Sequence, residues 1–237
     1  FDMRFDDVTE SFLNIKSKDM IDLFDTVLYK KIPEQFTSLF DTGILTKQLS
    51  KEFTHESFEF SIKSFALRQI YIQNYGFLLV SKQLINNLYK QLENSKTLEV
   101  GAGSGFLASH LQKKVFYDAI DEFPIEQNNY GFTSNYGYVQ TVQAEKYLSK
   151  HINDYQNILM SWPNYDTSFA HNVLKLMQPK QKLYYCGEDK YGCTANDNFF
   201  DLLKSKAVLN EKLTDELNKN HYSWPGVHDC WSVYNIK

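Results

Sequence analysis

An apolar run, a glycine-rich turn and a helical pattern follow one another over residues 97–107, and this succession constrains the fold most. Glycine occupies alternate positions of the turn, at Gly101, Gly103 and Gly105. Such a turn requires backbone angles that glycine adopts readily, and it lets the main chain approach a ligand closely. The segment therefore predicts a nucleotide-type site at the junction of a buried strand and a helix.

Short apolar runs alternate with helical patterns from residue 97 onward. This alternation predicts βαβ units and a mostly parallel sheet. A final antiparallel pair of strands is expected over 207–213 and 231–236. The other predicted strands span 97–100, 115–120, 157–161 and 183–186, and the predicted helices span 104–113 and 167–177.

The N-terminal part of the chain has a different pattern. Apolar residues recur at helical spacing over 11–92, and an amphipathic helix is expected to end just before Asn94. A chain of 237 residues is long enough for one main core with an extension. We therefore expect a helical extension or lid over 1–94 and a ligand-binding domain over 95–237.

The composition of the chain limits the classes of partner that we expect it to bind. The net charge of -4 gives no strong nucleic-acid signal, with a local basic patch as the alternative. No apolar run approaches the roughly 20 residues that a membrane helix needs. The three cysteines, Cys186, Cys193 and Cys230, have no CxxC spacing, which favours a reducing, cytoplasmic setting. His221 and His228 are too isolated in sequence to make a ligand set, so we predict no metal.

An acidic residue follows the second predicted strand. A carboxylate at this position can accept hydrogen bonds from both ribose hydroxyls of a nucleoside, and Asp121 is the predicted residue. Asp118 is the alternative. A third interpretation makes the glycine turn a packing device and Asp121 a helix cap.

The segment from Glu99 to Gly105, with the sequence EVGAGSG, resembles motif I of class I S-adenosylmethionine-dependent methyltransferases. Dinucleotide oxidoreductases more often have GxGxxG, a spacing that this turn lacks. The resemblance implies a Rossmann-like α/β fold with a seven-stranded sheet, S-adenosylmethionine as cofactor and S-adenosylhomocysteine as product. It also implies that Glu99 places the amino-acid part of the ligand.

Other segments resemble an uncharacterised methyltransferase-like subgroup: 75–77, 161–165, 186–194 and 224–229. By family analogy Gln143 or Ala144 contacts the adenine, although a solvated helix start is the alternative. Together with Asp121, which rests on its position alone, the predicted cofactor-binding residues are Tyr75, Glu99, Gly101, Ala102, Gly103, Gly105, Gln143, Ala144 and Ser161.

The loop after the fourth expected strand departs from a family pattern. Amino-group methyltransferases often have Asp or Asn, two prolines and an aromatic residue here, whereas this chain has Trp162-Pro163-Asn164-Tyr165. The departure argues against amino-group methylation. Ser161, Tyr165 or Asp166 could orient a nucleophile, and the alternative is a rigid proline turn that only shapes the pocket.

Two later loops carry further candidates. Glu188 could act as general base or substrate ligand, or lie in a glycine-hinged surface loop with solvated acids. His228 could act as acid, base or hydrogen-bond donor, or satisfy a carbonyl in a hairpin turn. Cys193 has no paired histidine in the sequence and is not predicted as a nucleophile.

We expect the loops at 161–166, 187–194 and 224–229 to converge on one acceptor pocket, because each returns to the ligand-bearing edge of the sheet. The sequence thus predicts a methyltransferase with an unidentified methyl acceptor. The altered loop at Trp162 keeps open a second interpretation, a catalytically inactive methyltransferase-like module that acts in binding or interaction.

Overall fold

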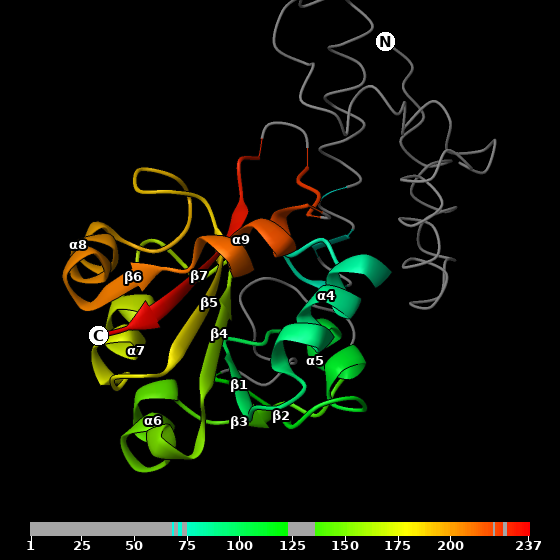
Figure 1. Cartoon of the computed structure of the whole chain (residues 1–237), viewed down its shortest axis with the longest axis horizontal. Coiled ribbons are helices and arrows are strands. Elements are labelled where there is room, and N and C mark those ends of the chain that lie inside the picture. Colours follow the sequence, from blue (N-terminus) through cyan, green and yellow to red (C-terminus); the bar gives the residue numbers. More distant parts are fainter. Residues whose placement is uncertain (1–67, 69–70, 73–74, 123–135, 220, 225–226) are drawn as a thin grey trace, which may run out of the picture.

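Seven strands form a single mixed sheet in the computed structural model, which describes residues 68, 71–72, 75–122, 136–219, 221–224 and 227–237. The strands lie in the order β3-β2-β1-β4-β5-β7-β6, and β7 alone runs antiparallel to its neighbours. Figure 1 shows this sheet with helices packed around it. The strands are β1 (Thr97–Val100), β2 (Tyr117–Asp121), β3 (Gln140–Thr141), β4 (Asn157–Ser161), β5 (Lys182–Gly187), β6 (Ala207–Leu209) and β7 (Cys230–Ile236).

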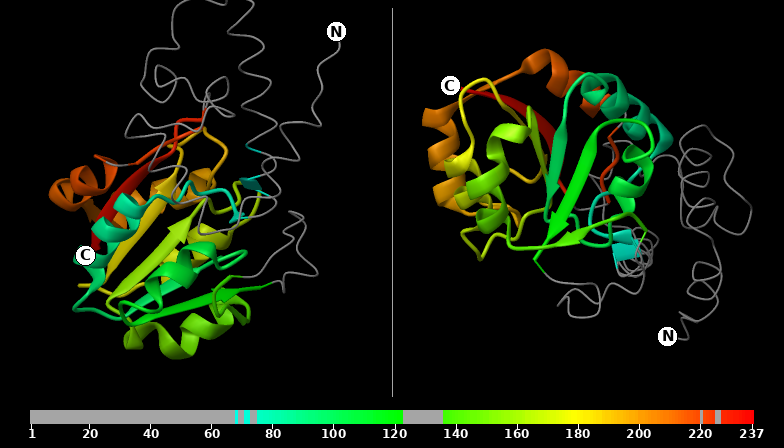
Figure 2. Two further views of the ribbon diagram at one scale, coloured as in Figure 1. Left: turned by 90° about the vertical axis from the view of Figure 1, so that its right-hand side faces the viewer. Right: turned by 90° about the horizontal axis from the view of Figure 1, so that it is seen from below.

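The helices cover both faces of the sheet (Figure 2). One hydrophobic cluster joins α4, α5 and α9 to one face, and a second joins α6, α7 and α8 to the other. This is the Rossmann-like, seven-stranded arrangement that the sequence predicts, and the predicted fold class is confirmed. The helices are α4 (Lys82–Leu92), α5 (Phe106–Leu111), α6 (Ala144–His151), α7 (Phe169–Leu176), α8 (Asp197–Lys206) and α9 (Glu211–Asn218), with a short 3-10 turn η3 (Ile152–Asp154).

The central strands are buried on both faces, as parallel strands between two helical layers must be. All four residues of β1 are buried, and in β4 Leu159 faces one cluster while Ile158 and Met160 face the other. The period of two places successive side chains in opposite layers. The predicted bounds of 97–100 and 157–161 therefore agree with the structure.

Two predicted elements differ at their ends for local reasons. The helix predicted from 104 begins at Phe106, because Gly105 has the left-handed φ of 71°. The strand predicted from 115 begins at Tyr117, because the N–H of Val115 still donates to the carbonyl of Leu111 at the end of α5. Such end shifts are expected where caps decide the boundary.

The strand predicted over 207–213 is wrong in its second half. The strand β6 ends at Leu209, and the Asn210 side chain accepts a hydrogen bond from the N–H of Leu213 at 3.2 Å, which caps α9. Leu217 of α9 is fully buried against α4 and the sheet. The antiparallel pairing of β6 with β7 is as predicted.

Most of the extension predicted over 1–94 lies outside the described residues. Its last helix, α4, is described and packs Leu84, Leu88 and Leu92 into the cluster that also contains β2 and β7 residues. The predicted domain boundary at 94/95 stays a prediction. Of the helices that the structure describes, none has the length and apolar character needed to cross a membrane.

Candidate functional site

A cavity of about 490 Å³ lies at the carboxyl ends of β1, β2 and β4. This is the edge of an open α/β sheet where ligands bind. Its size is within the range of small-molecule and cofactor sites. The predicted cofactor residues that line it are Tyr75, Glu99, Gly101, Ala102, Gly103, Asp121, Gln143, Ala144 and Ser161.

The glycine turn forms the floor of the cavity between β1 and α5. Gly103 has a left-handed φ of 53° and directs its main-chain N–H at Asp121 Oδ2, 2.8 Å away. Gly105 is the one predicted cofactor residue outside the cavity lining. A Cβ on Gly105 would lie 2.7 Å from Val139 Cγ2, so this glycine admits a neighbouring segment of chain instead. The turn thus serves both the cavity and the packing beside it.

The two candidate aspartates of β2 have different surroundings. Asp121 lines the cavity at the end of the strand. Asp118 accepts a hydrogen bond from the Tyr155 hydroxyl at 2.7 Å and pairs with Lys96 at 3.1 Å, outside the cavity lining. Of the two, Asp121 is therefore the one that a ligand in the cavity could meet.

Glu99 is a buried acid in the middle of the sheet. Its side chain borders the cavity, and the Tyr117 hydroxyl donates to Glu99 Oε2 at 2.9 Å. Burial raises the pKa of Glu99 to about 8, although the Tyr117 hydrogen bond opposes this. A cationic group placed beside Glu99 would favour its ionised form.

The opposite wall of the cavity is formed by the start of α6 and by α7. The Gln143 side chain is exposed and makes no capping bond to α6, while Ala144 is buried. Glu145 accepts a hydrogen bond from Asn172 Nδ2 at 3.0 Å, and Phe169 lies beside Gly101. Sequence reasoning missed Glu145, Phe169 and Asn172 as lining residues, since a helical pattern alone does not tell which face meets a cavity.

Trp162 forms the rim of the cavity after β4. Its backbone has a positive φ of 52°, and its N–H donates to the Cys186 carbonyl at 2.8 Å. The indole stacks on Phe77 with centroids 5.6 Å apart, and the Arg68 guanidinium lies 5.6 Å from the ring centroid. Trp162 Nε1 donates to Asp229 Oδ2 at 2.9 Å. The indole is thus fixed on its faces and at its polar edge.

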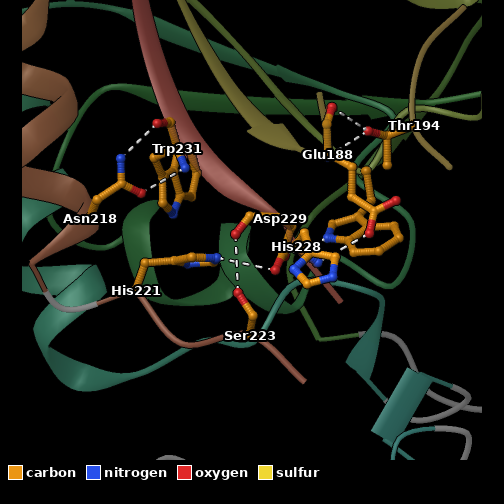
Figure 3. A network of polar contacts seen from close by, with 9 residues as sticks. Glu188, Thr194, Asn218, His221, Ser223, His228, Asp229 and Trp231 are labelled. Atoms are coloured by element: carbon orange, nitrogen blue, oxygen red, sulfur yellow. Dashed lines mark hydrogen bonds and ion pairs between the residues drawn. The ribbon is translucent and has the colours of Figure 1, made fainter. Parts of the chain in front are cut away.

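The loops predicted to converge are joined by hydrogen bonds. Glu188 accepts from the N–H of Cys193 at 2.7 Å. It also accepts from the N–H of His228 at 3.1 Å (Figure 3). The Ala195 N–H donates to the Pro163 carbonyl, and Asn164 forms an isolated bridge with Thr194. The loop after β4, the loop after β5 and the loop before β7 therefore form one cluster.

The four predicted catalytic residues lie outside the cavity lining. Glu188 is half-buried, and both of its carboxylate oxygens accept main-chain N–H bonds. Tyr165, Asp166 and His228 are exposed. Their roles stay predictions, as does the acceptor pocket itself. Pro225 and Gly226 of the last loop lie outside the described residues.

Two features of the loop cluster had no signal in the sequence. Arg68 reaches Trp162 from 94 positions away in the chain, which no local pattern indicates. Cys186, His221 and Asp229 meet behind Trp162, although the sequence position of His221 does not indicate a ligand set. Contacts between distant loops depend on the sheet order, which places β5 beside β7.

No protein-family model matches the chain. No curated protein matches it in sequence. Among solved structures, the chain is similar to TrmN from Thermus thermophilus, with 12% identity and a TM-score of 0.39 over 65% of this chain and 48% of that one. The chain thus spans about half the length of TrmN.

Two further solved structures to which the chain is similar carry methyltransferase names. The N-methyltransferase NodS from Bradyrhizobium japonicum WM9 has 12% identity and a TM-score of 0.40, covering 65% of this chain and 92% of that one. A TehB-like SAM-dependent methyltransferase from Corynebacterium glutamicum ATCC 13032 has 13% identity and a TM-score of 0.39, covering 65% of this chain and 88% of that one.

Proposed function

We propose that this protein is an S-adenosylmethionine-dependent methyltransferase whose cofactor occupies the cavity above the glycine turn. The observation that carries the proposal is the joint placement of Glu99, the glycine turn and Asp121 around one cavity at the carboxyl edge of the sheet. Glu99 suits the cationic group of such a ligand, and Asp121 suits its ribose. The glycine turn suits the part that lies against the main chain.

The residues present fit the cofactor in chemical terms. Glu99 would face the ammonium group of the ligand, and the attraction would offset the cost of ionising a buried carboxyl group. The Asp121 carboxylate would accept hydrogen bonds from the ribose hydroxyls. These would replace its hydrogen bond from the Gly103 N–H or be made in addition to it. Gln143 and Ala144, at the start of α6, would border the adenine.

The cofactor supplies a methyl group on a positively charged sulfur. When bound, it would deliver this methyl group to a nucleophilic atom of the acceptor, and the electron pair of the carbon–sulfur bond would stay on sulfur. A protonated acceptor releases its proton to solvent or to a base. The protein's main contribution would be to hold the acceptor in line with the methyl group.

The acceptor would enter beside Trp162, which borders the cavity after β4. Trp162 and Phe77 present aromatic surface there, and Arg68 supplies a positive charge. The aromatic surface suits a planar acceptor.

A second candidate function is a binding module without transfer activity. The observation that favours it is the engagement of Glu188, since both carboxylate oxygens already accept main-chain N–H bonds. An acid used to hold a loop is a poorer general base than one free to meet a substrate.

Calorimetry separates the ligand classes. We expect binding of S-adenosylmethionine and S-adenosylhomocysteine by the full chain, and no binding of NAD. Formation of S-adenosylhomocysteine with a panel of small-molecule, protein and RNA acceptors then separates enzyme from module. Failure to bind either sulfur ligand would overturn the proposed function.

A further inference from the structure

Three potential metal ligands meet in the loop cluster behind Trp162. Cys186 Sγ, a ring nitrogen of His221 and a carboxylate oxygen of Asp229 all lie within 4.8 Å of one another. They come from three parts of the chain: the end of β5, the segment after α9 and the residue before β7. Figure 3 shows the His221 ring directed at the Asp229 carboxylate.

These groups are buried and incompletely satisfied. Cys186 has no exposed surface, and the side chains of His221 and Asp229 are 5% and 4% exposed. His221 Nε2 lies 3.4 Å from Asp229 Oδ1, a contact of opposite charges when the ring is protonated. Within the described part of the chain, both His221 nitrogens and Asp229 Oδ1 have no hydrogen-bond partner.

Buried polar atoms in folded proteins almost always have hydrogen-bond partners, because leaving one unmade is costly. A pairing of His221 with Asp229 would account for one ring nitrogen and leave Nδ1 without a partner. A cation bound by the Cys186 thiolate, a His221 ring nitrogen and Asp229 Oδ1 would give these buried polar atoms a partner.

The surroundings orient the Asp229 carboxylate for this role. Its second oxygen, Oδ2, accepts the hydrogen bond from Trp162 Nε1 at 2.9 Å. The Ser223 hydroxyl donates to the main-chain oxygen of Asp229 at 3.0 Å. Outer hydrogen bonds such as the one from Trp162 Nε1 fix metal-ligating carboxylates in metalloproteins.

We propose that Cys186, His221 and Asp229 bind one zinc ion. Zinc takes thiolate, imidazole and carboxylate ligands together and favours four-coordinate tetrahedral sites. Metal–ligand bonds of about 2.0–2.3 Å place ligand atoms roughly 3.2–3.8 Å apart, so small side-chain movements bring these three into place. A water molecule would take the fourth position, and the Cys186 thiol would release its proton on binding.

The zinc ion would connect the end of β5 to the chain on both sides of the last loop. None of its three ligands lines the cofactor cavity. Through Asp229 it would also hold the Trp162 indole at the cavity rim. Zinc binding would thus stabilise this loop cluster, and it does not depend on the proposed methyltransferase function.

The test uses the full chain, stripped with a chelator and then titrated with Zn²⁺ alone. We expect one equivalent of zinc, measured by mass spectrometry of the metal, and a rise in the thermal unfolding midpoint. Co²⁺ in place of zinc should give a near-ultraviolet absorption from thiolate-to-cobalt charge transfer, which reports a cysteine ligand directly.

Variants assign the ligands. Cys186→Ser should abolish the cobalt absorption, and His221→Ala should weaken zinc binding at least about 100-fold, because each removes a ligand atom. Cys193→Ser, on an exposed side chain, and His151→Ala, on a half-exposed one, are controls outside the trio and should bind as the wild type does.

The chain has only three cysteines, so the assignment survives even if Cys186→Ser does not fold. In that case retention of the cobalt absorption in both Cys193→Ser and Cys230→Ser leaves Cys186 as the ligand. Less than one tightly held equivalent of zinc in the wild type, or loss of the absorption in Cys193→Ser, would overturn the proposal.

Discussion

The carboxylate of Asp121 accepts a hydrogen bond from the main-chain N–H of Gly103, with 2.8 Å between Oδ2 and N. The bond joins the end of β2 to the glycine turn after β1, and both residues line the same cavity. A single acid thus supports the turn and stands where a ribose would lie. This double role makes Asp121 the sharpest test of the proposed cofactor site.

Asp121→Ala should weaken binding of S-adenosylmethionine by about 1–3 kcal/mol, or roughly 5- to 150-fold in Kd. The reason is the loss of hydrogen bonds to a charged acceptor. Calorimetry on the folded variant measures the change. Asp118→Ala is the matched control, since Asp118 contacts Tyr155 and Lys96 outside the cavity lining. The reverse ranking of the two variants would contradict this assignment.

Glu99 should make stability depend on pH. Its pKa in the folded protein is about 8, against an ordinary value of 4.5. Between these values the folded state binds the proton more tightly than the unfolded state, so the free energy of unfolding falls as pH rises from about 5 to about 8. Glu99→Gln removes the ionisable group and should be more stable than the wild type by up to about 4 kcal/mol near pH 8.

Urea unfolding near pH 5 and near pH 8 checks this prediction for Glu99. The exposed Glu93→Gln variant is the control and should follow the wild-type pH dependence. If the free energy of unfolding changes equally with pH in Glu99→Gln and in the wild type, the buried acid does not titrate in this range.

The cap of α9 gives a prediction for the part of the fold that the sequence pattern missed. Asn210→Ala should lower the free energy of unfolding by about 0.5–2 kcal/mol, because the N–H of Leu213 loses its capping acceptor. Asn210→Asp keeps an acceptor oxygen and should stay near the wild type. Thermal unfolding measures both variants, and equal loss in the two would argue against a capping role.

The core of the sheet could be predicted because local patterns decide it. Residues 97–100 are consecutive buried positions before Gly101, residues 157–160 are consecutive buried positions before the half-buried Ser161, and both strands have the predicted bounds. The segment 207–213 shows the limit of this reasoning. Its apolar residues suit a strand, but the Asn210 cap begins a helix whose Leu217 has a buried place against α4.

The candidate site also contains residues that the sequence predicts and residues that it does not. Residues attached to the ends of predicted strands, such as Asp121 and Ser161, reach the cavity because strand ends share one edge. Arg68 and His221 reach the loop cluster through contacts of long sequence separation, which depend on tertiary packing. Glu188 lies in the cluster as predicted, yet its carboxylate turns toward main-chain N–H groups rather than the cavity.

The last prediction concerns whether Glu188 reacts or holds the loops in place. As a loop-holding residue it joins the N–H groups of Cys193 and His228, so Glu188→Ala should speed amide hydrogen exchange at both positions. Cofactor affinity should stay within about twofold of the wild type, because Glu188 lies outside the cavity lining.

The conservative variant separates the two roles of Glu188. Glu188→Gln keeps one acceptor oxygen and should recover slow exchange at one of the two N–H groups, together with part of the methyl transfer lost in Glu188→Ala. A general base cannot be replaced in this way, since a neutral amide accepts no proton from a substrate at neutral pH. Transfer that is absent in Glu188→Gln while hydrogen exchange stays at the wild-type rate would therefore assign the proton-accepting role to Glu188 and reject the loop-holding one.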